Sequence, residues 1–183
     1  ATATAMSQEL GKLGGYSQTE KENICRQIGL GALKYYILKV DPKKNMTFNP
    51  AESIDFNGNT GPFIQYSYAR IRSVMKKAEE TGAGTGKDDC RDILPNAKEI
   101  SVIKLLNDFP GLVQEAAVEL SPALIANYCY ELAREFNQFY HDYTILGEND
   151  GKIRDFRLKL SELTGRVLES GLWLLGIEPP ERM

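Results

Sequence analysis

The 183 residues (20.5 kDa) provide enough chain to bury one ample core or two small ones. With 42% hydrophobic and 26% charged residues, the composition is that of a globular protein and excludes intrinsic disorder. No apolar run reaches the length of a membrane span, and no basic region followed by an apolar segment opens the sequence. We therefore expect no membrane as a partner and a cytoplasmic location.

The net charge of -3 is unevenly distributed along the chain. Residues 1–80 carry eleven Lys or Arg against eight Asp or Glu, residues 81–151 carry five against twelve, and residues 152–183 carry six against five. A polyanion is therefore expected to meet the first and last thirds of the chain and to avoid the acidic middle.

Cysteine and histidine usage argues against nucleophilic catalysis and metal binding. Cys25, Cys90 and Cys129 are odd in number, far apart and outside any C-x-x-C pattern, so neither a disulfide framework nor a zinc site is expected. His141 is the only histidine, and the sequence offers it no Ser or Cys partner. We expect no catalytic residue and no metal site in this chain.

The first sixty residues predict helices joined by an irregular connection. Residues 1–13 are compatible with a helix, and Ser17-x-x-Glu20 is a capping box that begins a second helix. Residues 41–61 form the irregular connection, which contains one brief helix beginning at Asn49-Pro50. The apolar positions of the second helix are Ile24, Ile28, Leu33, Tyr36, Ile37 and Val40.

A helix with an unusual polar face is predicted over residues 62–80, with Thr60 as its N-cap. At about 100° per residue, one side gathers the apolar Ile64, Ile71, Val74, Met75 and Ala78. The other side presents Tyr66, Arg70, Ser73 and Lys77. That side is either a solvated surface or a stacking and phosphate-contact surface for single-stranded nucleic acid, because a flat ring accepts any base while cations meet the backbone. Periodicity alone does not decide between these two interpretations.

The glycine-rich residues 81–89 predict a surface loop, since they lack the G-x-x-x-x-G-K-[ST] pattern of a phosphate-binding loop. Beyond Asn96 the pattern is helical. Two short helices are expected on either side of a turn at residues 109–111. Ser121-Pro122 then begins a long helix, and its aromatic stripe is interpreted as core: Leu124, Ile125, Tyr128, Cys129, Leu132, Phe136, Phe139 and Tyr140.

A last long helix follows the loop at residues 147–151 and is expected to be interrupted or bent at Gly171, with Gly176 as C-cap and Pro179-Pro180 preventing its continuation. No long alternating pattern typical of a sheet occurs. The predicted fold is an all-α helical bundle with one irregular connection near residues 41–61. The apolar positions of the last helix are Ile153, Phe156, Leu160, Leu163 and Val167.

Three segments then resemble one family. Residues 31–40, residues 56–72 and the ending at residues 176–183 resemble arginyl-tRNA synthetases at their C-terminal end, in order as well as in separation. The resemblance implies a class I aminoacyl-tRNA synthetase whose catalytic domain precedes this chain, and a DALR-type anticodon-binding bundle within it. Residues 1–60 would be the helical connection from that missing domain and residues 61–183 the anticodon-binding bundle, packed as one unit.

The resemblance also implies roles for individual residues. The tyrosine and arginine of the Gln-Tyr-x-x-x-Arg segment and the terminal methionine, here Tyr66, Arg70 and Met183, are expected to lie against the tRNA anticodon loop. Further contacts to the RNA backbone are expected from helix position and charge alone at Lys77, Arg154, Arg157 and Arg166.

The family's activity would require a nucleotide site that this chain lacks, because neither a HIGH-type nor a KMSK-type segment is present. ATP and Mg²⁺ would serve the full-length enzyme and tRNA for arginine would be the partner, while the isolated chain is expected to be inactive. An alternative is a free-standing helical scaffold that binds proteins through the acidic middle. An independent small-molecule enzyme is the least supported hypothesis, because the chain has no nucleophile, metal cluster or paired acids.

Overall fold

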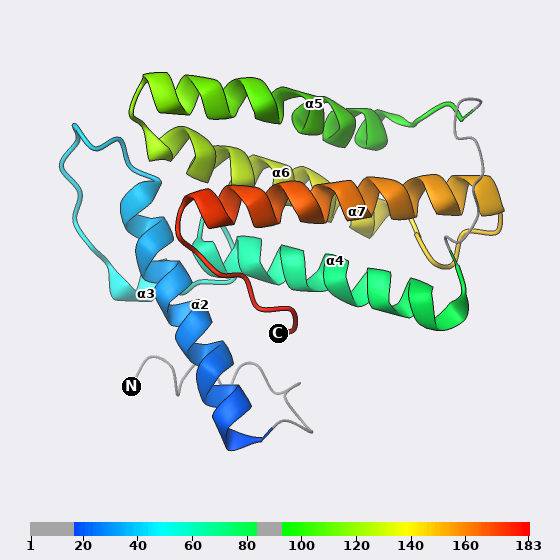
Figure 1. The fold of residues 1–183 in the computed structure, drawn as a ribbon, viewed down its shortest axis with the longest axis horizontal. Helices are drawn as coiled ribbons and strands as arrows, with labels where there is room; N and C mark the ends of the chain where they lie inside the picture. The colour runs from blue at the N-terminus through cyan, green and yellow to red at the C-terminus, as the bar shows by residue number, and fades with distance from the viewer. Residues whose placement is uncertain (1–16, 84–92) are drawn as a thin grey trace.

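The computed structural model describes residues 17–83 and 93–183. Within them the chain forms six α-helices and no strand, so the predicted all-α bundle is confirmed (Figure 1). The helix expected in residues 1–13 and most of the glycine-rich loop lie outside the described residues. The helices are α2 (Gln18–Leu38), α3 (Pro50–Ser53), α4 (Gly61–Thr81), α5 (Ala97–Val118), α6 (Pro122–Asp142) and α7 (Gly151–Leu174).

Most helices begin where the sequence predicts because a side chain caps the free backbone N–H groups of the first turn. Ser17 and Glu20 form the predicted capping box of α2, Asn49 caps α3, and the Thr60 hydroxyl accepts from the N–H of Phe63 in α4. Helix α6 begins after Ser121 as predicted, but that side chain makes no capping hydrogen bond.

Four long helices build the bundle and a fifth crosses it. Helices α4, α5, α6 and α7 lie side by side, and α2 runs obliquely across the start of α4 (Figure 1). The core that they share includes the fully buried Tyr35, Ile64, Ile71, Val102, Leu132, Phe136, Phe139, Leu168 and Leu172.

The crossing of α2 and α4 depends on two glycines. A Cβ added at Gly61 would lie 2.7 Å from the carbonyl oxygen of Gly31, and one added at Gly31 would lie 2.5 Å from Nε2 of Gln65. Contacts this short require something to shift. At Gly61 the obstacle is backbone, so only glycine permits this approach, whereas a Cβ at Gly31 would have to displace the amide of Gln65. This approach decides which face of α2 is buried.

The face predicted to be buried on α2 is correct at Ile28 and wrong at Leu33 and Ile37, which are 40% and 50% exposed. The buried side carries Cys25, Ile28, Gly31, Ala32 and Tyr35. Small residues, which a hydrophobicity pattern ranks low, make the closest contact with α4. Leu30, Leu33 and Ile37 consequently form an exposed apolar surface on α2.

The predicted turn at residues 109–111 does not form, because α5 is a single helix that contains Pro110. Pro110 lacks an N–H and leaves the carbonyl of Leu106 without its helical donor, which normally kinks or ends a helix. Tertiary contacts from Tyr128 of α6 outweigh this penalty. Its ring stacks on Phe109 with a centroid distance of 5.3 Å, and its hydroxyl donates to the carbonyl of Leu105 at 2.8 Å.

Helix α7 also differs from its predicted pattern. It passes through Gly171 without interruption, and the expected core residue Leu163 is 40% exposed. Its buried face contains small and polar residues as well as leucines, including Ser161, Thr164, Gly165 and Gly171. Gly165 and Gly171 face Ile71 of α4 and Cys129 of α6.

The C-terminal end of α7 has the predicted glycine. Gly176 adopts a φ of 66°, its N–H donates to the carbonyl of Trp173, and the N–H of Ile177 donates to that of Leu172. These two bonds define a Schellman motif, which turns the chain sharply out of the helix. The tail at residues 177–183 therefore runs back toward α4 (Figure 1).

Arg157 of α7 requires a correction, because it is buried instead of available to RNA. Its Nε donates to Glu99 at 2.8 Å, and its Nη1 donates to Glu148 at 2.7 Å and to the carbonyl of Thr144 at 2.8 Å. The residue is 7% exposed, and the ring of Tyr143 covers the guanidinium at 5.1 Å. Arg157 thus joins α5, α7 and the loop between α6 and α7, so it is removed from the candidate RNA contacts.

The contact between α6 and α7 predicts a coupled effect on stability. Gly171→Ala should destabilise the chain by about 1–3 kcal/mol, because the added Cβ would lie 2.4 Å from Sγ of Cys129. In a Cys129→Ala background the same change should cost about 1 kcal/mol less, measured by urea unfolding of the double-mutant cycle. Gly111→Ala, where no atom lies within 4 Å, is the control and should be stabilising. Equal costs in both backgrounds would contradict the packing described.

The Arg157 network predicts an asymmetry between two arginines of the same helix. Arg157→Met should lower the free energy of unfolding by about 3–5 kcal/mol, since Glu99 would be left as a buried and unpaired charge. Arg166→Met removes an ion pair to Glu162 whose arginine side chain is 67% exposed, and should change it by less than about 1 kcal/mol. Chemical denaturation of both variants makes the comparison, and similar losses would refute the structural role of Arg157.

Candidate nucleic-acid interface

Helix α4 contacts a different neighbour on each of three sides. Tyr68 donates to Glu169 of α7, Ser67 receives a hydrogen bond from Asn137 of α6, and Gln65 donates to the tail. The fourth side faces outward between α6 and the tail and carries Tyr66, Arg70, Ser73 and Lys77, as predicted.

The Arg70 guanidinium lies between two tyrosine rings. Its Cζ is 4.9 Å from the centroid of Tyr66, one turn earlier on α4, and 5.1 Å from that of Tyr140 on α6. A cation over an aromatic face is attracted by the ring quadrupole, and the planar guanidinium stacks there better than an ammonium. We call these three residues the Tyr-Arg-Tyr stack.

A chain of hydrogen bonds fixes the direction of Arg70. Its Nη1 donates to Oδ1 of Asn137 at 2.5 Å, Nδ2 of Asn137 donates to the hydroxyl of Ser67 at 2.6 Å, and that hydroxyl donates to the carbonyl of Phe63 at 2.8 Å. Each group in this chain donates and accepts in a fixed order, so the arginine is held before any ligand arrives.

Tyr140 and Asn137 contact Arg70 and join the candidate site, although the sequence pattern did not identify them. Tyr140 was assigned to the core, but it is 37% exposed and packs its ring on Phe136 at 6.2 Å and on Arg70. It lies at the edge of the aromatic stripe of α6, where a tyrosine can turn its ring outward. The sequence did contain one indication: Tyr140 lies three residues after Asn137, and this spacing places both on one side of α6.

The C-terminal tail, which ends at Met183, runs along the same helix. None of the hydrogen bonds and ring contacts described joins Met183 to the Tyr-Arg-Tyr stack. Pro180 is buried, Glu181 pairs with Arg72 of α4 at 3.4 Å, and Met183 is half-buried two residues later. Two residues span at most about 7 Å, so the backbone of Met183 stays within that distance of Glu181.

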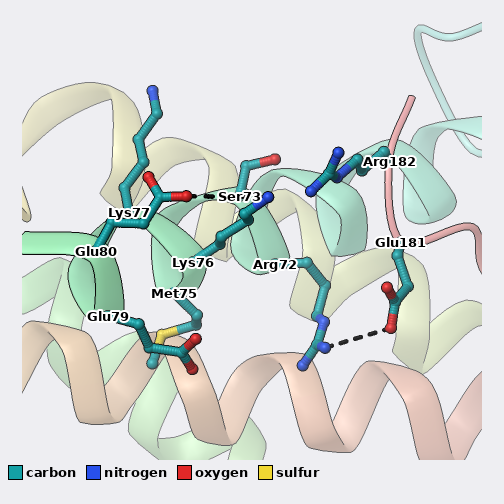
Figure 2. Close-up of a pocket in the computed structure, with 9 residues that line it drawn as sticks. All are labelled: Arg72, Ser73, Met75, Lys76, Lys77, Glu79, Glu80, Glu181 and Arg182. Atoms are coloured by element: carbon teal, nitrogen blue, oxygen red, sulfur yellow. Dashed lines mark hydrogen bonds and ion pairs between the residues drawn. The ribbon is translucent and has the colours of Figure 1, made fainter. Parts of the chain in front are cut away.

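A cavity of about 450 Å³ continues the surface along α4 toward its C-terminal end (Figure 2). Glu181 and Glu80 pair with Arg72 and Lys76 there. Lys77 is exposed and extends away from its neighbours in Figure 2, and it forms no ion pair within residues 17–83 and 93–183. The cavity is lined by Arg72, Ser73, Met75, Lys76, Lys77, Glu79, Glu80, Glu181 and Arg182.

The two remaining arginines lie elsewhere. Helix α7 contacts α4 through Tyr68 and Ile71, which face away from the Tyr-Arg-Tyr stack. Arg154 on α7 has a side chain that is 32% exposed and lies 3.6 Å from Asp155, while Arg166 pairs with Glu162 at 2.6 Å. The structure therefore does not bring Arg154 or Arg166 together with Tyr66 and Arg70.

Reactive groups are buried or absent in the part of the chain described. Burial raises the pKa of the Cys129 thiol to about 12, so it remains protonated and is a poor nucleophile. Residues 17–83 and 93–183 contain no group of three His, Cys, Asp or Glu side chains able to hold a metal ion. None of the helices among these residues is long and apolar enough to cross a membrane.

The geometry is suited to binding unpaired bases. A ring held against a guanidinium offers its other face for stacking, which contributes about 1–3 kcal/mol per base in single-stranded complexes. Arg70 uses one donor on Asn137 and has further N–H groups in a fixed plane for a base edge or a phosphate. Lys77 and its neighbours in the cavity supply charge beside the stack.

Comparison with other sequences gives long matches to one kind of enzyme. The arginine–tRNA ligase of Parabacteroides distasonis is 55% identical over 183 residues, which is all of this chain and 31% of that protein. The arginine–tRNA ligase of Flavobacterium psychrophilum is 50% identical, again over all of this chain and 30% of its own length. The chain thus spans about 30% of the length of the relatives it matches.

Solved structures give a similar result. The arginyl-tRNA synthetase of Thermus thermophilus superposes with a TM-score of 0.85 at 33% identity, covering 99% of this chain and 30% of that one. The arginyl-tRNA synthetase of Plasmodium falciparum superposes with a TM-score of 0.76 at 23% identity, which supports the fold alone.

A family model covers the part of the chain that carries the stack. The model for the DALR anticodon binding domain matches residues 64–183, from the start of α4 to the end of the tail. Tyr66, Arg70, Asn137, Tyr140 and Met183 all lie within these limits. The chain belongs to the DALR anticodon binding domain family.

Proposed function

We propose that this chain is the part of an arginine–tRNA ligase that binds the anticodon loop of tRNA for arginine. The observation that carries the proposal is the Tyr-Arg-Tyr stack, which is held on an outward face of a DALR anticodon binding domain. The similarity to arginine–tRNA ligases over the whole of this chain supports the choice of enzyme. The chain would position the tRNA, while a separate catalytic domain attaches arginine with ATP.

Binding would proceed through shape and stacking. A base turned out of the anticodon loop stacks on Tyr66 or Tyr140, and the remaining N–H groups of Arg70 donate to its edge or to a phosphate. Met183 covers an apolar base face with its polarisable thioether. Because Asn137 holds Arg70 in place beforehand, little side-chain entropy is lost when the RNA binds.

The distribution of charge directs the RNA to this face. Lys76, Lys77 and Arg182 lie at the cavity beside the stack, whereas α5 and α6 carry half of the acidic residues of the middle of the chain. A phosphate backbone is attracted to the first surface and repelled by the second. We therefore place the anticodon stem over the cavity and along the C-terminal half of α4.

ATP and Mg²⁺ have no place among the described residues in this proposal. Neither a HIGH-type nor a KMSK-type segment occurs in the sequence, which supports assigning ATP and Mg²⁺ to the catalytic domain. In this proposal the chain binds and orients RNA, and the chemical steps take place in the catalytic domain.

The proposal predicts a loss of RNA affinity when a stacking group is removed. Tyr66→Ala should weaken binding of an arginine tRNA by about tenfold or more, and deletion of Met183 should also weaken it, measured by fluorescence anisotropy at low salt. Trp173→Ala is the control, because Trp173 is a 76% exposed aromatic residue on α7. The proposal would fail if Tyr66→Ala had no effect, or if a tRNA with an unrelated anticodon loop bound equally well.

Stacking and charge can be separated on α4. Arg70→Lys keeps the charge but loses the planar fork, so affinity should fall several-fold while the dependence of log K on log salt remains unchanged. Lys77→Gln should instead reduce the magnitude of that slope by about one, the value for one lost phosphate contact. Titrations at several salt concentrations test both variants, and an unchanged affinity for Arg70→Lys would show that this residue acts only as a point charge.

A further inference from the structure

Gln65 is a polar side chain buried at the junction of three chain segments. It is 0% exposed, and its Nε2 donates to the carbonyl of Gln27 in α2 at 3.3 Å and to the carbonyl of Glu178 in the tail at 3.2 Å. Gln65 precedes Tyr66, but its side chain points away from the outward side of α4. None of the RNA contacts proposed above involves it.

Packing alone does not explain a glutamine at this position. Its Oε1 is buried without a hydrogen-bond partner, and such a group costs free energy that an apolar side chain of similar size would avoid. Space for the amide exists only because Gly31 has no Cβ, which would lie 2.5 Å from Nε2. The gain from a glutamine here must therefore come from its amide donor. The two acceptors of that donor, the carbonyls of Gln27 and Glu178, belong to α2 and to the tail.

Two side chains of α4 contact the tail among the hydrogen bonds and ion pairs described. The ion pair of Glu181 with Arg72 is largely solvated, since the two side chains are 76% and 49% exposed, and contributes little. The Gln65 bond to Glu178 is part-buried, and its donor belongs to a side chain that is 0% exposed. Pro179 and Pro180 follow with fixed φ angles, so a direction set at Glu178 is transmitted stiffly to the last three residues.

We propose that Gln65 is a positioning residue that fixes the course of the C-terminal tail against α4 and so sets the position of Met183. The inference rests on the proposed function. Two consecutive residues of α4 then contribute to the proposed RNA-binding surface in different ways. Tyr66 supplies a ring for stacking, and Gln65 holds the C-terminal tail in place.

The position of the tail can be measured without RNA. In the 183-residue chain with ¹³C-methyl methionine, the Met183 resonance should move to the shift and narrow linewidth of an unfolded peptide in Gln65→Leu. It should remain in place in Gln114→Leu, which alters an exposed glutamine of α5. An unchanged Met183 resonance in Gln65→Leu would overturn the proposal.

An isosteric variant separates the amide donor from packing. The carboxyl group introduced by Gln65→Glu has no donor for the Glu178 carbonyl when it is ionised, whereas its protonated form has one, and burial raises the pKa of a carboxyl group. The tail signal of Gln65→Glu should therefore be released at high pH and return toward its native position as pH falls. A pH-independent signal would contradict the role of the donor. This variant also provides the comparison if Gln65→Leu does not fold.

Affinity for tRNA tests whether the tail acts through its position. Gln65→Leu should weaken binding by about the same factor as deletion of Met183, and the two changes together should weaken it little further. Additive losses would overturn the proposal. A third outcome separates the two proposals. If the tail is released in Gln65→Leu but the unaltered chain does not bind tRNA, Gln65 positions the tail and the proposed function is contradicted.

Discussion

The close approach of α2 and α4 at Gly31 and Gly61 is the constraint on which the rest of the structure depends. It selects the buried face of α2 and leaves room for the amide of Gln65, through which α4 holds the tail. A Cβ at Gly61 would meet the backbone of Gly31, and a Cβ at Gly31 would meet the amide of Gln65. Two residues without functional groups therefore permit the packing in which Gln65 contacts the tail.

Helix α4 combines core and surface because its neighbours meet it on three different sides. The contact with α6 forms the seam from which Asn137 and Tyr140 reach Arg70. Cation-π attraction and hydrogen bonding act on the same guanidinium, one fixing its plane and the other its direction. This preorganisation favours ligands that are flat and anionic, and the unpaired nucleotides of an anticodon loop have both properties.

The arginines of this chain divide according to their surroundings. Arg157 is enclosed by two carboxylates, a carbonyl and a tyrosine ring, so its charge is used within the fold. Arg70 is held by the amide oxygen of Asn137, a neutral acceptor that does not cancel its charge. Arg166 is exposed but shares Glu162 with Lys159, and hydrogen bonding to Lys159 is the main reason that the pKa of Glu162 is lowered. The three side chains have the same chemistry, and they differ in the acceptors that surround each guanidinium.

The sequence by itself determined the all-α class, most helix starts and the outward face of α4, because caps and helical periodicity are local properties. It also indicated Tyr66 and Arg70. Tertiary structure alone decided that α5 continues through Pro110, that small residues of α2 and α7 form their buried faces, and that Arg157 is internal. Tertiary structure alone also brought Tyr140 and Asn137 next to Arg70. In each case the deciding contact comes from a residue distant in sequence, and no local pattern encodes the partner that a side chain will meet.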